Sequence, residues 1–166
     1  NNIDVVQSRG SVVDVTKSEH KIQFSVNGNH RFHTFVACKP SLDSSGVGSF
    51  WKVTIDALPS TWLCLGIIGN LDHASNDSYA DSTSYGWANN KKVYYDGTDE
   101  KGKSGWNGFS MGECLYFHLK SNKLTTFHVQ KNKKFIIDVA TTVGAYYIQF
   151  NMYYTNTMLT LEPLDE

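Results

Sequence analysis

A period-two alternation of apolar and polar residues recurs along most of this chain and limits what it can fold into. Ile22, Phe24 and Val26 alternate with polar neighbours, and residues 51–55 show the same pattern. Since successive side chains of a β-strand point to opposite faces, this alternation predicts strands with one buried face. Two later segments, 114–119 and 145–152, repeat the pattern, so strands are expected through to the C-terminal part of the chain.

Residue pairs that favour tight turns lie between these segments. They tolerate the positive φ that short hairpins need. Helix is expected to be scarce, with at most one short turn near residues 2–7. We therefore predict an all-β fold, a bent antiparallel two-sheet β-sandwich with a jelly-roll-like outline. The expected turns are Asn27-Gly28, Asp96-Gly97, Ser121-Asn122 and Val143-Gly144.

Length and charge limit the organisation and the partners. A chain of 166 residues is expected to form one domain over residues 1–166. Its net charge of −1 gives no reason to expect attraction to nucleic acid or to an anionic membrane. No apolar run approaches the roughly 20 residues that span a bilayer. Three widely spaced cysteines favour reduced thiols, and hence an intracellular and cytoplasmic location.

Residues 97–104 match the phosphate-binding pattern G-x-x-x-x-G-K-S. A true phosphate loop opens a helix whose N-terminal amides hold the phosphates. Here residues 105–109 follow, with two glycines and two aromatic residues, so a helix is not expected to begin. Asp99 and Glu100 would also face the negative charge of the nucleotide. The sequence therefore predicts a solvated polar loop and no bound nucleotide.

Residues 108–112 match the nucleophile-elbow pattern G-x-S-x-G around Ser110, which needs a helix directly after the turn. A strand pattern follows instead. His30 and His33 would point to opposite faces of a strand, which makes them a poor chelate. We therefore expect a non-catalytic protein, with no catalytic residue, no cofactor and no metal site.

Charge is unevenly distributed within the chain. Residues 91–134 hold nine lysines and four acidic residues, whereas residues 135–166 hold no lysine or arginine. We interpret the basic segment as a solvated charged face, able to orient an acidic partner. The long polar connections at 41–49, 73–84 and 98–107 are expected to carry recognition, as loops on rigid sandwiches commonly do.

The order and spacing of several segments resemble the SPRY domain family. The segments are 50–55, 62–68, 85–87 (Tyr-Gly-Trp), 93–95, 112–113 (Gly-Glu) and 124–127. The resemblance is strongest over residues 49–161. A PRY segment is not evident, and residues 1–20 are expected to be an N-terminal extension or the first strands.

This resemblance implies a cofactor-free protein-interaction module, often part of a ubiquitin ligase or a signalling protein. We expect a monomeric domain that binds a peptide or protein partner through loops at one end of the sandwich. By position, the resemblance places this pocket at Ser41, Leu42, Asp43, residues 78–81, Thr142, Val143 and Gly144. Relatives that bind Asn-rich peptides carry an aromatic residue in the turn that here reads Thr-Val-Gly.

An interaction surface also needs rigid anchors and polar groups that fix register. Tyr79, Tyr85 and Trp106 are the candidate anchors. The surrounding acidic residues predict a partner that is basic or rich in asparagine. A carbohydrate-binding, lectin-like sandwich is the alternative, since it shares a similar outline. The candidate acceptors are Asp43, Asp72, Asn76, Asp77 and Asp81.

Overall fold

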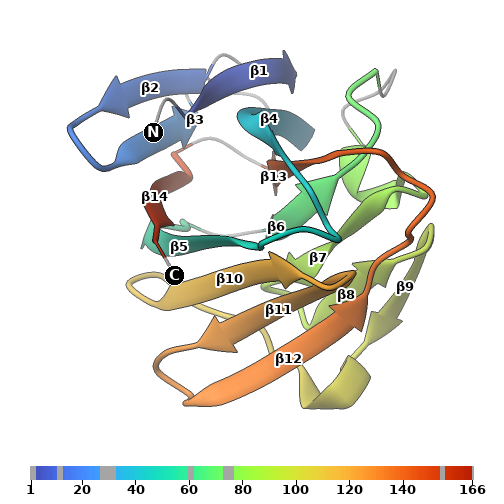
Figure 1. The fold of residues 1–166 in the computed structure, drawn as a ribbon. Helices are drawn as coiled ribbons and strands as arrows, with labels where there is room; N and C mark the ends of the chain where they lie inside the picture. The colour runs from blue at the N-terminus through green and yellow to red at the C-terminus, as the bar shows by residue number, and fades with distance from the viewer. Residues whose placement is uncertain are drawn as a thin grey trace.

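A computed structural model of the chain describes residues 3–10, 13–26, 33–59, 62–72, 77–153 and 156–165. These residues form two antiparallel seven-stranded sheets packed face to face (Figure 1). The fold is therefore the predicted β-sandwich. Helix is confined, within the described residues, to two short 3₁₀ turns, η1 (Ser78–Ala80) and η2 (Lys103–Gly105).

In the first sheet, sheet A, several neighbouring strands are far apart in the sequence. In spatial order it contains β1 (Asp4–Arg9), β4 (His33–Leu42), β13 (Tyr146–Tyr153), β6 (Trp62–Ile68), β7 (Ser84–Ala88), β8 (Lys92–Tyr95) and β9 (Thr98–Lys101).

The second sheet, sheet B, is assembled in the same way. In spatial order it contains β12 (Lys133–Asp138), β11 (Lys123–His128), β10 (Cys114–Lys120), β5 (Ser49–Ala57), β14 (Met158–Leu164), β3 (Ile22–Val26) and β2 (Val13–Lys17). The two ends of the chain thus supply strands to both sheets.

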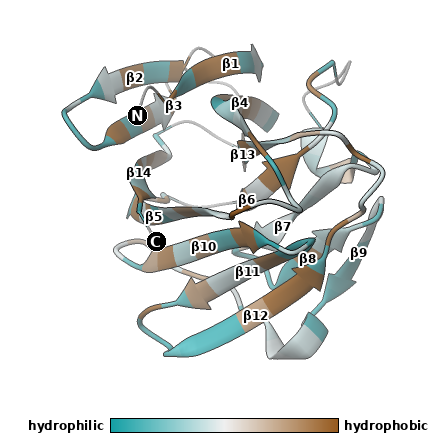
Figure 2. Cartoon of the chain, in the orientation of Figure 1, coloured by the Kyte–Doolittle hydropathy of each residue, from teal (hydrophilic) through white to brown (hydrophobic). Residues whose placement is uncertain are grey.

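The alternation read from the sequence becomes the inner faces of the two sheets. Ile22, Phe24 and Val26 are buried, while the residues between them are only half-buried. Trp51 of β5 stacks on Phe117 of β10 with ring centroids 5.4 Å apart. Figure 2 shows the hydrophobic positions distributed along the strands of both sheets. One main cluster of buried side chains includes residues from Ile3 to Leu161. The expectation of a single domain over residues 1–166 stays a prediction.

Two of the predicted hairpin turns are confirmed by their backbone. Asp96-Gly97 has φ values of 50° and 73°, and Ser121-Asn122 has 53° and 59°. Asn27-Gly28 lies outside the described residues. Val143-Gly144 is not a hairpin turn, because it joins β12 of sheet B to β13 of sheet A and so passes from one sheet to the other.

Two other local predictions are wrong. The short helical turn expected near residues 2–7 is replaced, over its described part, by β1, which pairs with β4 from Asp4 onward. The loop expected at 98–107 begins with β9, because this polar segment completes a hairpin with β8 at the edge of sheet A. The first 20 residues therefore supply first strands, β1 and β2.

The outer face of sheet A is covered in part by η1. Ser78 is buried there, and its hydroxyl donates to Gln149 Oε1 at 2.9 Å and accepts from Asn151 Nδ2 at 2.7 Å. These bonds satisfy polar side chains of β13 that would otherwise be costly to bury. Within the described residues, none of the helical segments is long and apolar enough to cross a bilayer.

Candidate functional site

The loop after β4 is held rigidly against the turn between β10 and β11. Asp43 closes a tight turn, in which its Oδ1 accepts hydrogen bonds from the backbone N and the hydroxyl of Ser45, both at 2.9 Å. The backbone bond from Ser45 lowers the pKa of Asp43. Ser44 is buried and its hydroxyl donates to Asn122 Oδ1 at 3.0 Å, while Asn122 N donates back to Ser44 O at 2.7 Å.

The connection between β12 and β13 lies beside this loop. Asn122 O accepts from Val139 N at 2.9 Å, so Asn122 fixes both segments. Two buried tyrosines hold the next residue: Tyr85 Oη accepts from Ala140 N at 3.2 Å, and Tyr146 Oη donates to Ala140 O at 2.8 Å. The polar segment at 142–144 is therefore attached at its start to the sandwich core.

The connection between β6 and β7 completes the arrangement. A Cβ placed on Gly69 would lie 2.5 Å from Val143 Cγ1, so the two loops are in direct contact. Asp81 Oδ1 accepts from Thr83 N at 2.8 Å and Asp81 Oδ2 from Asn70 Nδ2 at 3.3 Å. We call the surface formed by residues 41–48, 69–72, 81–83 and 139–145 the loop rim.

The loop rim contains most of the binding residues expected from the sequence. Leu42 pairs with Tyr146 across β4 and β13, which places the end of β4 at the start of the rim. Asp81 differs from the expected free acceptor, because its carboxylate is already occupied in shaping the rim. The expected residues that lie on the rim are Ser41, Leu42, Asp43, Asp72, Asp81, Thr142, Val143 and Gly144.

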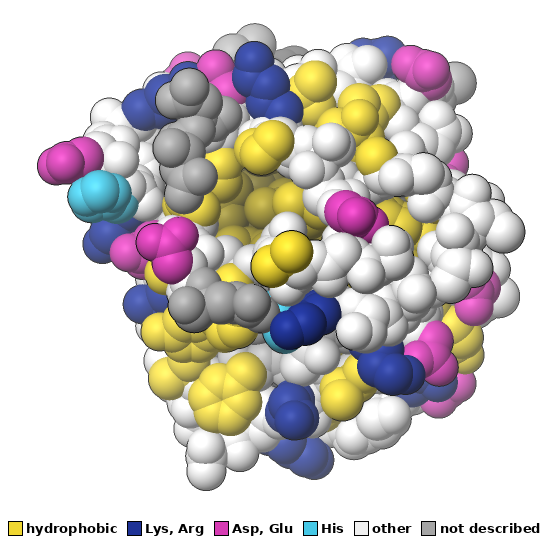
Figure 3. Space-filling model, in the orientation of Figure 1, with side chains coloured by type: hydrophobic (Ala, Val, Ile, Leu, Met, Phe, Trp, Pro, Cys, Tyr) yellow, Lys and Arg dark blue, Asp and Glu magenta, His cyan; other side chains and the backbone are white. Residues whose placement is uncertain are grey.

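An apolar hollow opens beside the first rim loop. It has a volume of about 290 Å³, and Leu42 and Val47 contribute to its wall, with Trp51 and Ile148 from the two sheets below them. Figure 3 shows hydrophobic atoms gathered around this hollowed area. Val47 is 83% exposed. Sequence reasoning missed this hollow because its wall is built from four separate stretches of chain; the apolar Val47 within a polar loop was the one local signal.

Tyr79 lies in η1, directly before the Asp81 segment of the loop rim, but its side chain packs against the end of β4 opposite Leu42. Its hydroxyl is 3.3 Å from His33 Nε2, and its ring lies 4.7 Å from that of Trp62. His33 begins β4 and Leu42 ends it, so this strand separates the two by about 30 Å. Tyr79 is half-buried in an aromatic group on the outer face of sheet A, and its part in a binding surface shared with the rim stays a prediction.

Tyr85 and Trp106 are buried, and the prediction that they are exposed anchors is wrong. Tyr85 is 0% exposed and its Oη donates to Asp96 Oδ1 at 2.6 Å. Burial raises the pKa of Tyr85 to about 12. Trp106 is 2% exposed, and its Nε1 donates to Ala88 O at 2.8 Å. Asp77 is exposed next to η1, and Asn76 lies outside the described residues.

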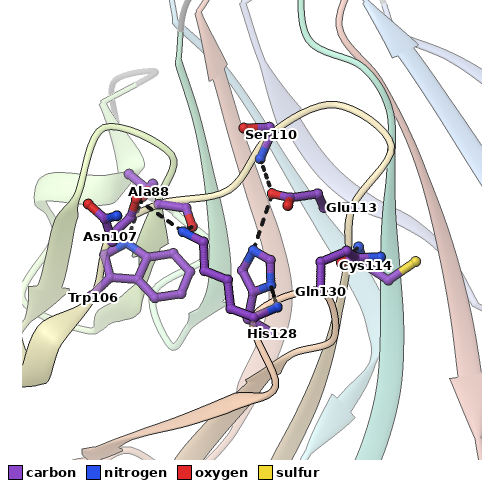
Figure 4. Close-up of polar contacts among 10 residues, drawn as sticks. Ala88, Trp106, Asn107, Ser110, Glu113, Cys114, His128 and Gln130 are labelled. Atoms are coloured by element: carbon purple, nitrogen blue, oxygen red, sulfur yellow. Dashed lines mark hydrogen bonds and ion pairs between the residues drawn. The ribbon is translucent and has the colours of Figure 1, made fainter.

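The elbow-like motif around Ser110 forms a structural junction instead of a nucleophile site (Figure 4). Glu113 Oε1 accepts from the backbone N of Ser110 at 2.6 Å and lies 3.2 Å from His128 Nε2. His128 Nδ1 accepts from Lys131 N at 3.2 Å, so the ring proton sits on Nε2 and is donated to Glu113. Both ring nitrogens are therefore engaged by groups other than the Ser110 hydroxyl, whereas a triad needs that contact.

The phosphate-loop motif also lacks the required helix. Its middle residues form β9, and η2 follows with Ser104 at φ 56°. Within the described residues, the structure shows no group of three or more His, Cys, Asp or Glu side chains arranged to hold a metal ion. Burial raises the pKa of the Cys38 and Cys64 thiols well above the ordinary value, so both are poor nucleophiles.

Comparison with known proteins gives a likeness in structure alone. No protein-family model matches the chain, and no curated protein matches it. The SPRY domain of human HERC1 superposes with a TM-score of 0.70 at 11% identity, over 99% of this chain and 98% of that one. The TRIM65 PSpry domain gives 0.59 at 13% over 93% and 86%, and a human SPRY domain gives 0.55 at 13% over 94% and 99%. At these identities the likeness establishes the fold.

Proposed function

Because the chain has the SPRY fold, we propose that it is a non-catalytic protein-interaction module that captures a peptide or protein segment at the loop rim. One observation carries this proposal: three loops far apart in sequence are held together by Asn122 and by the Gly69–Val143 contact, next to an apolar hollow. A surface that is already ordered loses little conformational entropy when it binds.

The chemistry of the rim indicates what the partner segment contains. The hollow of about 290 Å³ has room for one apolar side chain, with Val47 at its edge. Asp43 and Asp72 are exposed and add negative charge to the rim. A partner segment with an apolar residue next to lysine, arginine or asparagine complements both features.

The wider setting of this domain is also part of the proposal. We place it as the recruiting portion of a larger intracellular protein, such as a ubiquitin ligase or a signalling component, in which it binds as a monomer. Of the four edge strands, β9 of sheet A and β2 of sheet B are short and carry mostly polar or charged residues, as expected of edges that avoid pairing with a second copy.

The proposal is tested by selecting binders from a displayed random-peptide library and measuring the affinity of the enriched peptides. We expect a consensus with an apolar residue beside Lys, Arg or Asn. Val47→Asp and Asp43→Ala should weaken binding about tenfold or more, as loss of a central contact does. Ile136→Asp is the matched control, because Ile136 is also an exposed apolar residue but lies on β12.

Thermal melting of each variant separates a lost contact from a lost fold. Peptides that bind Val47→Asp as tightly as the wild type would place the binding surface elsewhere. A glycan array provides the test of the lectin alternative. Saturable sugar binding together with no selected peptide would reject the proposed function.

A further inference from the structure

A second concave site lies at the other end of the sandwich from the loop rim. Its volume is about 460 Å³. It lies between the edge strands of the two sheets, β9 and β12, with η2 beside it (Figure 1). β12 runs from Lys133 in this site to Asp138 next to the rim, a separation of about 17 Å. Four lysines line the site, which we call the basic pocket: Lys91, Lys101, Lys131 and Lys133.

The positive charge of the basic pocket is not neutralised by nearby acidic side chains. No carboxylate is among its lining residues, and none of its four lysines forms an ion pair with another described residue. The acids nearest along the chain bond elsewhere: Asp99 pairs with Lys92 at 3.1 Å, Glu100 Oε1 accepts from Tyr95 Oη at 3.1 Å, and Glu113 bonds to His128. A concave surface of one sign concentrates the electrostatic field and attracts an ion of the opposite sign.

Several contacts hold the lysines in place. Lys131 Nζ donates to Gly108 O at 3.0 Å and to Asn107 O at 3.4 Å. A Cβ on Gly105 would lie 2.9 Å from Lys133 Nζ, so this ammonium group sits directly against the glycine backbone. Gly102 N donates to Lys91 O at 2.8 Å and joins the two lysine-bearing ends of β8 and β9. The ammonium groups of Lys131 and Lys133 are thus arranged before any ligand arrives, whereas Lys91 and Lys101 are brought to the pocket by their backbone.

We propose that the basic pocket binds a phosphorylated side chain of a partner protein. A phosphate monoester carries between about −1.5 and −2 charges at pH 7 and three acceptor oxygens, which suits several ammonium groups around one concavity. Two residues of the phosphate-loop-like motif, Lys101 and Gly102, line this pocket although the motif opens no α-helix. The motif would therefore contribute to phosphate binding in a way that differs from a true phosphate loop.

The observations favour a phosphoprotein over a nucleic acid. Single-stranded nucleic acids bind along a groove with exposed rings on which bases stack. The rings in this pocket, Trp106 and Phe135, are 2% and 4% exposed and so offer no stacking surface. The charge is also confined to one concavity, which matches a single anionic group.

Three peptide libraries with randomised flanks test the proposal, with a central phosphoserine, serine or glutamate. We expect the phosphoserine library to bind about tenfold or more tightly than the serine library, since it alone supplies the dianion. Its affinity should rise from pH 5.5 to pH 7.5, because the second phosphate proton leaves near pH 6. The glutamate library should show no such rise.

The double variant Lys131→Gln/Lys133→Gln should lose most of this phosphate-dependent binding. Lys91→Gln/Lys101→Gln gives the same test without touching the bonds that Lys131 makes to the backbone. Lys21→Gln/Lys39→Gln is the control of equal charge, because both residues are exposed and line a different groove. The control should retain wild-type affinity for the phosphoserine library.

Three results would overturn the proposal: equal binding of the serine and phosphoserine libraries, equal loss in the control variant, or tighter binding of a single-stranded RNA or of anionic vesicles with the same lysine dependence. The proposal does not depend on the loop rim. Val47→Asp should leave phosphoserine binding unchanged, so failure at one site is distinguishable from failure at the other.

Discussion

His128 and Glu113 form a hydrogen bond of 3.2 Å between Nε2 and Oε1, and the His128 side chain is fully buried. The same glutamate oxygen accepts from the backbone of Ser110. This pair therefore fastens the loop before β10 to the turn that follows β11. The nucleophile-elbow pattern would assign Ser110 to catalysis. The hydrogen bonds of Glu113 to Ser110 and His128 instead stabilise the fold.

Glu113→Ala should destabilise the protein by about 1–3 kcal/mol, because it leaves the buried His128 N–H and the Ser110 amide without their acceptor. Chemical denaturation measures this change. Ser110→Ala keeps the backbone N–H and should unfold at nearly the wild-type denaturant concentration. A larger loss in Ser110→Ala than in Glu113→Ala would contradict the assigned roles.

Trp106→Ala should cost about 3–5 kcal/mol, since the ring fills the core between Trp87 and Phe135. Trp106→Phe keeps most of the ring but removes the indole N–H, so Ala88 O loses its donor, at a cost of about 1–3 kcal/mol. Denaturant midpoints compare the two variants. Wild-type stability in Trp106→Ala would mean that the ring is not part of the core.

Gly86→Ala should be destabilising by about 1–3 kcal/mol, because overpacking forces the surrounding backbone to move. A Cβ at Gly86 would lie 2.2 Å from Leu65 O, where β7 pairs with β6. Gly112→Ala is a control with open space around the new methyl group, although its φ of 86° adds backbone strain. Thermal melting of both variants separates the steric clash from the strain.

Stability should fall as the pH drops below about 6.5. Burial among aromatic rings lowers the pKa of His33 below its ordinary value, although Asn151 and Asp77 act against this shift. As the pH falls, the unfolded chain therefore takes up a proton at His33 before the folded protein does. The contribution of neutral His33 to the free energy of unfolding is fully present above pH 6.5 and declines as the pH falls towards the lower pKa of the folded state. Melting temperatures from pH 8 to pH 5 should fall less for His33→Gln than for wild type.

The alternation of apolar residues was enough to predict the sandwich, because a half-buried strand imposes a period of two on its own sequence. Ile22, Phe24 and Val26 illustrate this, since each was predicted to face the core and is buried. Asp96-Gly97 was predictable for a similarly local reason, as its conformation depends on those two residues. In contrast, a polar segment such as β9 becomes a strand only through its pairing with β8.

The candidate site was predictable in part. Leu42, Asp81 and Val143 were expected near one another by resemblance, and the structure brings their loops together. Tyr85 and Trp106 were misplaced, because an aromatic residue beside polar neighbours reads as exposed until the opposite sheet is known. The hollow at Val47 and the basic pocket were not predictable, since each draws on strands from distant parts of the chain.

The sequence by itself determined that this protein is built from strands, where several of them run and which of their residues face inward, because those properties are set by neighbours along the chain. Only the tertiary structure decided which aromatic rings are buried, which loops share a rim and which lysines share a pocket. Those properties arise from contacts between segments that can lie more than a hundred residues apart, as Leu42 and Tyr146 do, and no local pattern records them.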